Sequence, residues 1–218
     1  MIDKTSPGRW RLYVITDESV SRGRSHIEVA EAAIRGGADV IQLRDKTASG
    51  GTLYRVAFAL RKLTREAKVP LIINDRLDIA LAADADGVHL GQKDLPAAVA
   101  RDIMGPGKIL GVSADTREEA LLAEKEGADY RGVGPVFGAR ETKADAGEPL
   151  GLERIARIRK HCRLPIVAIG GIDAQNARQV REAGADSAAV ISAIVAADDI
   201  TQAARELKSI LSAGDPGR

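Results

Sequence analysis

Short runs of β-branched and aliphatic residues alternate with longer amphipathic segments along the whole chain. Apolar residues with helical spacing occur in the segments 27–35, 53–67, 117–126 and 152–161. Several of the short runs are almost continuously apolar, which is typical of parallel strands covered by helices. The pattern predicts eight strands, at residues 12–16, 39–44, 70–74, 87–90, 108–113, 130–134, 165–169 and 187–191.

An eightfold alternation of strand and helix has two main solutions, a closed (β/α)8 barrel and a doubly wound open sheet. A short repeat favours the barrel, because Gly37-Ala38-Asp39, Gly127-Ala128-Asp129 and Gly184-Ala185-Asp186 each close a helix and lead into a strand. Ala85-Asp86-Gly87 is a variant, and the glycine of the repeat supplies the left-handed helix stop. We therefore expect an α/β fold, a single-domain TIM barrel over residues 10–211. A flexible lead-in at 1–9 and a disordered tail at 212–218 would flank it.

Composition and charge narrow the classes of function. Of the 218 residues 44% are hydrophobic, and 32 basic against 31 acidic side chains leave a net charge of +1, so neither nucleic acid nor a membrane surface is expected as a partner. The one cysteine, Cys162, fits a reducing cytosol, and six aromatic residues predict an aliphatic core. No apolar run reaches the roughly 18 residues of a membrane span, and residues 1–9 do not resemble a signal peptide. We expect a cytoplasmic chain.

The second strand ends in a cationic face. Active sites of barrels lie at the carboxyl ends of the strands, and side chains alternate along a strand, so Gln42, Arg44 and Lys46 share one face. Two cations cannot pack against aliphatic helices, so this face is expected to point into the barrel mouth and bind phosphate or diphosphate. The alternative is a buried ion-pair cluster inside the barrel.

Two carboxylates follow the third and fourth strands. Asp75 and Asp94 stand at adjacent strand ends beside the cationic face, which suits Mg²⁺, an ion that binds one or two carboxylates together with phosphate oxygens and water. The competing interpretation is that they cap the helices beginning near Leu77 and Pro96. The neighbouring cationic face favours Mg²⁺ as the cofactor.

The last two strands and the sixth loop offer a second anion site. Gly170-Gly171 and Ile191-Ser192-Ala193 end the seventh and eighth strands, where barrels often form a phosphate cup from backbone amides. A plain tight turn is the alternative for the glycine pair. Lys143, with Arg140 and Thr142 in the long loop 137–149, is placed to close over a phosphate, although a solvated loop charge is the commoner case. The site is thus expected to hold a metal-bridged diphosphate and a monophosphate.

The histidines are assigned no catalytic role. His26 lies in the first turn of a helix and His161 lies late in another. His89 is in mid-strand and fits a satisfied interior residue equally well. Cys162 has no partner pattern for a nucleophile.

The ordered set of motifs resembles the thiamine-phosphate synthase family, barrel enzymes that join the pyrimidine and thiazole halves of thiamine. The resemblance runs from about residue 12 to residue 204. The motifs that carry it are Leu12-Tyr13-Val14-Ile15-Thr16-Asp17, Gln42-Leu43-Arg44-Asp45-Lys46, Ile73-Asn74-Asp75-Arg76, the segment 87–96, Gly111-Val112-Ser113, Gly134-Pro135-Val136-Phe137, Thr142-Lys143 and Ile169-Gly170-Gly171-Ile172.

The resemblance implies roles for the matching positions. Those implied to bind the pyrimidine diphosphate are Gln42, Leu43, Arg44, Asp45, Lys46, Asn74, Ser113 and Lys143. Those implied to bind the thiazole phosphate, plain or carboxylated, are Arg140, Glu141, Thr142, Gly171, Ile191 and Ser192. Asp75 and Asp94 would hold Mg²⁺, and Arg44 and Lys143 would be catalytic. The implied reaction is dissociative: diphosphate leaves, and the thiazole nitrogen attacks the resulting pyrimidinylmethyl cation without a general base.

Two departures from the family's pattern define the alternatives. The family usually has Thr-x-Thr-Lys in the sixth loop, where this chain has Ala139-Arg140-Glu141-Thr142-Lys143, and a histidine where this chain has Asp115. A related thiazole tautomerase would use that histidine, and a non-catalytic thiamine-phosphate-binding barrel would lack the metal pair or Lys143. A more generic alternative is a sugar-phosphate isomerase on the same barrel, which would need an acid/base pair of carboxylates and would lack the cationic face of the second strand. A homo-oligomer is compatible with the sequence.

Overall fold

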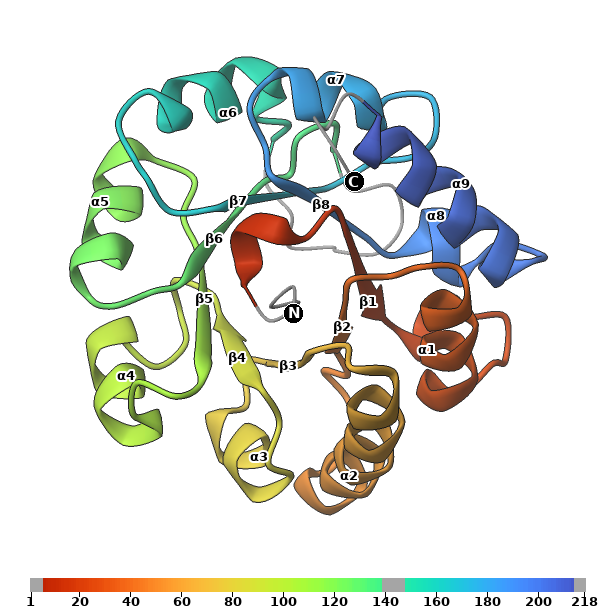
Figure 1. Cartoon of the computed structure of the whole chain (residues 1–218). Coiled ribbons are helices and arrows are strands. Elements are labelled where there is room, and N and C mark those ends of the chain that lie inside the picture. Colours follow the sequence, from red (N-terminus) through yellow and green to blue (C-terminus); the bar gives the residue numbers. More distant parts are fainter. Residues whose placement is uncertain (1–5, 139–147, 214–218) are drawn as a thin grey trace.

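The computed structural model describes residues 6–138 and 148–213 and shows a closed barrel of eight parallel strands (Figure 1). The strands are β1 (Leu12–Thr16), β2 (Val40–Leu43), β3 (Leu71–Asn74), β4 (Gly87–Leu90), β5 (Ile109–Ser113), β6 (Tyr130–Val133), β7 (Ile166–Ile169) and β8 (Ser187–Val190). Each strand pairs with the next, and β8 closes the barrel by pairing Ala188 with Leu12 of β1. The predicted barrel is confirmed, and every strand begins and ends within one residue of its predicted run.

Helices surround the barrel as an outer layer (Figure 1). They are α1 (His26–Arg35), α2 (Gly50–Ala67), α3 (Leu77–Ala82), α4 (Ala97–Met104), α5 (Arg117–Lys125), α6 (Gly151–Arg159), α7 (Ala177–Glu182), α8 (Ser192–Val195) and α9 (Ile200–Ser212), with 3-10 turns η1 (Pro7–Arg9) and η2 (Glu18–Val20). Ser25 and Thr116 begin α1 and α5 with capping boxes. Small buried residues such as Ala30, Ala100 and Ala204 let the helices approach the strands closely. No helix in the described ranges is long and apolar enough to cross a membrane.

The Gly-Ala-Asp repeat builds the turns into the even-numbered strands. Gly37, Gly127 and Gly184 have φ values of +97°, +85° and +104°, so the predicted left-handed helix stop is confirmed at all three. In the variant turn before β4, Asp84 takes this conformation instead, with φ +51°.

The aspartate of each repeat ties two neighbouring strands together at the amino-terminal end of the barrel. Its backbone N–H donates to the carbonyl of a residue at the start of the preceding strand, and its carboxylate accepts the N–H of that same residue. The four pairs, with their N–H to carboxylate distances, are Asp39 with Leu12 (3.0 Å), Asp86 with Leu71 (2.8 Å), Asp129 with Leu110 (2.7 Å) and Asp186 with Ile166 (2.8 Å).

Each of these carboxylates also forms an ion pair with the outer layer. The cations are Lys208 of α9 for Asp39, Arg61 of α2 for Asp86, Arg101 of α4 for Asp129 and Arg159 of α6 for Asp186. One carboxylate therefore joins two strands and a helix. We call this arrangement, repeated four times around the barrel, the aspartate clamp.

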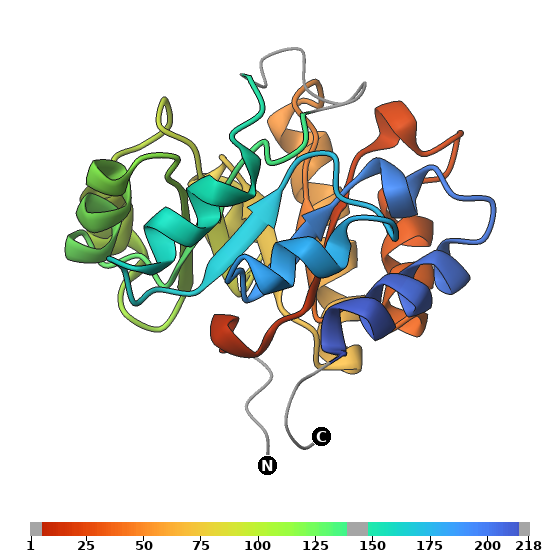
Figure 2. The same ribbon diagram turned by 90° about the horizontal axis from the view of Figure 1, so that it is seen from above.

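Aromatic residues fill the amino-terminal end of the barrel interior. η1 lies across this end (Figures 1 and 2), and Trp10, which follows it, packs edge-on against Tyr13 and Tyr130 with ring centroids 5.7 and 5.3 Å away. The layer between helices and strands is aliphatic as predicted, but this part of the interior is not, because large rings are needed to fill it. Of the predicted flexible ends, Pro7–Arg9 form η1 and Ser212 ends α9. Residues 1–5 and 214–218 lie outside the described ranges.

The clamp makes a testable contribution to stability. We expect Asp86→Asn to lower the free energy of unfolding by about 1.5–3 kcal/mol, because it weakens charge-assisted bonds to Leu71 N and Arg61. The matched control is Asp84→Asn, two residues away, whose carboxylate pairs with Arg65 and Lys108 but is 64% exposed. This control should cost under about 1 kcal/mol. Urea unfolding of both variants would measure the difference, and equal losses would contradict the clamp.

Candidate active site

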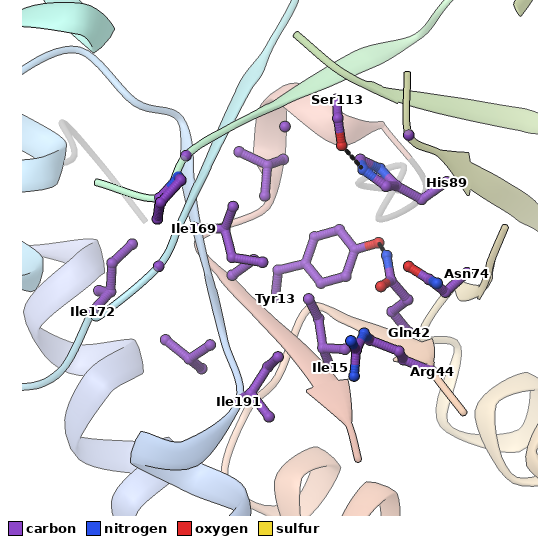
Figure 3. Close-up of a pocket in the computed structure, with 18 of the residues that line it drawn as sticks. Tyr13, Ile15, Gln42, Arg44, Asn74, His89, Ser113, Ile169, Ile172 and Ile191 are labelled. Carbon is purple, nitrogen blue, oxygen red and sulfur yellow. Dashed lines mark hydrogen bonds between the residues drawn. The ribbon is translucent and has the colours of Figure 1, made fainter. Parts of the chain in front are cut away.

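A cavity of about 900 Å³ opens at the carboxyl ends of the strands, where barrel enzymes carry their chemistry. All eight strands or the loops that follow them contribute to its wall. The cavity has two unlike sides (Figure 3). Gln42, Arg44, Asn74, His89 and Ser113 form a polar side, and Ile169, Ile172 and Ile191 form an apolar side.

The cationic face of β2 points into this cavity. Gln42 of β2 and Arg44 and Lys46, which directly follow the end of this strand, all line it, on the side that the alternation of side chains predicts. The guanidinium of Arg44 forms an ion pair with Asp17, and the two side chains are only 9% and 8% exposed. The buried ion pair that stood as the alternative thus exists for Arg44, whose side chain nevertheless lies in the cavity wall.

The side chains of Leu43 and Asp45, which alternate with Gln42, Arg44 and Lys46, point away from the cavity. Leu43 is buried on the opposite face of β2. The carboxylate of Asp45 accepts the N–H groups of Thr47 and Ala48, each at 2.8 Å, and so holds the turn after the strand. Neither side chain lines the cavity, so their implied contacts with substrate stay predictions.

Asp75 and Asp94 lie together on the polar side. The pKa of Asp75 is raised to about 6, because burial and the adjacent Asp94 carboxylate both oppose its ionisation, while Lys46 and Arg44 partly offset them. Asp94 accepts the N–H of Gly91 at 2.7 Å. The helices α3 and α4 begin without a side-chain cap, so the structure gives no support to capping by these aspartates.

The loops after β7 and β8 form the facing wall, with Gly171, Ile191 and Ser192 among its residues. Gly170 and Gly171 have φ values of +101° and +65°. A Cβ atom on Gly170 would lie 2.5 Å from Pro135, and one on Gly171 would lie 2.6 Å from the carbonyl oxygen of Gly138. Both the backbone conformation and the lack of space for a Cβ atom therefore require glycine at positions 170 and 171. A phosphate cup and a tight turn would each have this requirement.

The ends of β3 and β5 bring Asn74 and Ser113 to the cavity. Asp115, which stands where the family has a histidine, also lines it, and its carboxylate accepts the N–H of Gly134 at 3.0 Å. The Asp115 side chain thus fastens the loop after β5 to the end of β6. Arg140, Glu141, Thr142 and Lys143 lie outside the described residues, and the roles predicted for them stay predictions.

Sequence reasoning assigned His89 no catalytic role and allowed a satisfied interior residue. Its ring lies in the cavity wall, with Nδ1 3.1 Å from the Tyr130 hydroxyl and Nε2 3.0 Å from Ser113 Oγ. The sequence did contain one indication that the His89 ring has a specific contact. Gly111 lies beside His89 in the strand register, and a glycine inside a strand often marks the close approach of another group.

Comparisons with known proteins agree with this geometry. A family model described as thiamine monophosphate synthase matches residues 12–194. A thiamine-phosphate synthase of Chloroflexus aurantiacus is 59% identical over 93% of either chain, and one of Methanocella arvoryzae is 53% identical over 94% of this chain and 96% of its own. The solved structure of a thiamine phosphate pyrophosphorylase from Pyrococcus furiosus has a TM-score of 0.87 and 44% identity, covering 94% of this chain and 97% of that one. The chain belongs to the thiamine monophosphate synthase family.

Proposed function

We propose that this chain is a transferase that condenses hydroxymethylpyrimidine diphosphate with a thiazole phosphate, releasing diphosphate and giving thiamine phosphate. The observation that carries the proposal is one cavity in which the β2 cationic face and a carboxylate pair stand opposite the glycine pair after β7 and the loop after β8. The relatives named thiamine-phosphate synthase, 59% and 53% identical over nearly the whole chain, support it.

The diphosphate would bind on the polar side. Lys46 and Arg44 offer charged donors, and Gln42, Asn74 and Ser113 offer neutral polar groups at the same strand ends. In the described residues of this side the protein supplies no net positive charge, because Arg44, Lys46 and Lys93 stand against Asp17, Asp75, Asp94 and Asp115. A trianionic substrate therefore needs a further cation. In the proposal this charge comes from Mg²⁺ and from Lys143 of the sixth loop.

Asp75 and Asp94 fit a divalent cation. The Asp94 carboxylate beside Asp75 helps to raise the pKa of Asp75, and a bound cation would offset this repulsion. No group of three or more histidine, cysteine or acidic side chains suited to a metal occurs in the described ranges, so diphosphate oxygens and water would complete the shell, as is usual for Mg²⁺. When bound, Mg²⁺ would add positive charge at the oxygens of the departing diphosphate.

The apolar side would hold the rings and exclude water. Ile169, Ile172 and Ile191 provide a surface for flat heteroaromatic rings, and a dry wall protects a pyrimidinylmethyl cation from hydrolysis (Figure 3). Backbone amides at Gly171, Ile191 and Ser192 would bind the thiazole phosphate. The thiazole nitrogen is a neutral nucleophile, so the chain needs to position it rather than deprotonate it.

The direct test is an assay with hydroxymethylpyrimidine diphosphate and thiazole phosphate, with Mg²⁺ or with EDTA. Thiamine phosphate, detected as fluorescent thiochrome after oxidation, is expected only with the metal, and Asp94→Asn should abolish most of it. No product from folded protein with Mg²⁺ would reject the proposed function. Equal product in EDTA would reject the metal.

A second prediction concerns stability, since folding raises the pKa of Asp75 above its ordinary value and so disfavours the charged form. Without metal at about pH 8, Asp75→Asn should unfold at a higher temperature than the wild type, and the difference should shrink as pH falls through about 6, because Asp75 of the wild type then takes up a proton. Asparagine also tolerates the φ of +61° at this position.

The matched control for this experiment is Asp198→Asn, a carboxylate whose side chain is 97% exposed, which should show no such pH dependence. Mg²⁺ should raise the unfolding temperature of the wild type and leave that of Asp75→Asn nearly unchanged. A variant that is less stable than the wild type at every pH would contradict the repulsion between the two aspartates.

A third prediction tests the cationic face. Lys46→Ala is expected to lower kcat/KM by about 10- to 100-fold, mainly through a higher KM for the diphosphate substrate, because a charged donor to phosphate is lost. Lys62→Ala, on the exposed side of α2, removes the same charge away from the cavity and should leave kcat/KM near that of the wild type. Steady-state kinetics of the two variants would decide, and an unchanged Lys46→Ala would remove this lysine from the site.

A further inference from the structure

A chain of hydrogen-bonded side chains crosses the barrel interior beneath the cavity. It runs from Gln42 through Tyr13, Tyr130 and His89 to Ser113, with successive contacts of 2.7, 2.9, 3.1 and 3.0 Å. Figure 3 shows both ends, the Gln42 contact with Tyr13 and the His89 contact with Ser113. The ends are residues proposed to meet the pyrimidine substrate, whereas the three rings between them have no part in the proposed function.

The first contact gives this chain a direction. The Nε2 amide of Gln42 can only donate, so the hydroxyl oxygen of Tyr13 accepts. The one proton of Tyr13 is then available for Tyr130, and the one proton of Tyr130 is available for Nδ1 of His89. An imidazole that accepts at Nδ1 and is neutral carries its proton on Nε2, from which it donates to Ser113.

The reverse direction leaves a buried proton unused. If His89 donated from Nδ1 to Tyr130, then Tyr130 would donate to Tyr13, which already accepts from Gln42. The hydroxyl proton of Tyr13, a residue 1% exposed, would then have no acceptor among its contacts. A buried donor without a partner costs about 1–3 kcal/mol, so the forward order is favoured. Burial also raises the pKa of both tyrosines, which keeps the two hydroxyl protons in place.

Two strand glycines make room for the central contacts. Gly111 lies between His89 and Tyr130 in the strand register, and a Cβ atom there would come within 2.4 Å of the Tyr130 hydroxyl and 2.6 Å of His89 Nδ1. A Cβ atom at Gly132 would lie 3.0 Å from His89 Cε1. Glycine weakens a strand, so its presence at both positions supports a specific close approach of these rings.

We propose that His89 is a positioning residue, held as the Nε2–H tautomer by Tyr130 and Tyr13, and that it turns the hydroxyl proton of Ser113 towards the substrate. Ser113 Oγ accepts from His89, so its own proton points to an acceptor atom of the bound substrate, a ring nitrogen or a phosphate oxygen. The tautomer itself does not rest on the proposed function, whereas the use of the Ser113 proton does.

The deciding experiment is long-range ¹H–¹⁵N NMR of the histidine rings in the substrate-free protein at about pH 8, where an ordinary imidazole is neutral. His89→Gln removes one set of signals and so assigns His89. We expect a pyridine-type Nδ1 and a protonated Nε2. A protonated Nδ1, or protons on both nitrogens, would overturn the proposal whether or not the protein makes thiamine phosphate.

Variants connect the tautomer to turnover. Tyr130→Phe should raise the share of the Nδ1–H tautomer and lower kcat/KM about tenfold, the effect of one lost hydrogen bond. Tyr54→Phe, which removes the same hydroxyl from a residue of α2 that is 38% exposed, should change neither. A Tyr130→Phe protein with an unchanged tautomer would overturn the proposal.

The conservative variants separate positioning from packing. The amide nitrogen of glutamine reaches the place of His89 Nε2 and can still donate to Ser113, whereas the shorter asparagine reaches only the place of Nδ1. His89→Gln should therefore retain about tenfold more activity than His89→Asn. Equal activity of the two variants would mean that the donor to Ser113 is not used.

Discussion

The aspartate clamp is the interaction on which the rest of the barrel depends. One carboxylate fixes a residue at the start of an odd-numbered strand against the following strand, and its ion pair holds the adjacent helix. This fixes the strand register, and register decides which side chains face inwards, since a slip of one residue turns every side chain of a strand around. The inward positions of Gln42 and Arg44 at one end of β2 thus follow from the bond of Asp39 at the other.

The site uses this rigid frame to hold groups that oppose folding. Asp75 has a left-handed backbone and lies beside Asp94, an arrangement that raises its pKa and that a ligand would relieve. The surrounding structure offsets the free energy that this strained and repulsive arrangement costs. The pairing of β3 with β4 and the hydrogen bond from the Gly91 amide to Asp94 hold the two aspartates in place. In the same wall, glycine replaces better strand formers so that His89 and Tyr130 can meet.

Periodicity and turn chemistry were sufficient to predict the barrel, its strand limits and the inward face of β2, because these depend on local pattern. The Gly-Ala-Asp repeat was visible in the sequence, but only its glycine could be interpreted, since the partners of Asp129 are at Leu110 and Arg101, far along the chain. No role could be assigned to His89 for the same reason, because its partners, Ser113 and Tyr130, lie on other strands. The site roles of Leu43 and Asp45 came from resemblance alone, and their side chains lie away from the cavity.

The four clamps lie at the amino-terminal end of the barrel, and the cavity lies at the carboxyl end. Stability and chemistry are therefore encoded in separate sets of residues, at opposite ends of the same strands. None of the clamp residues lines the cavity. Mutations at the carboxyl end can therefore change substrate specificity while the clamps at the amino-terminal end maintain the fold.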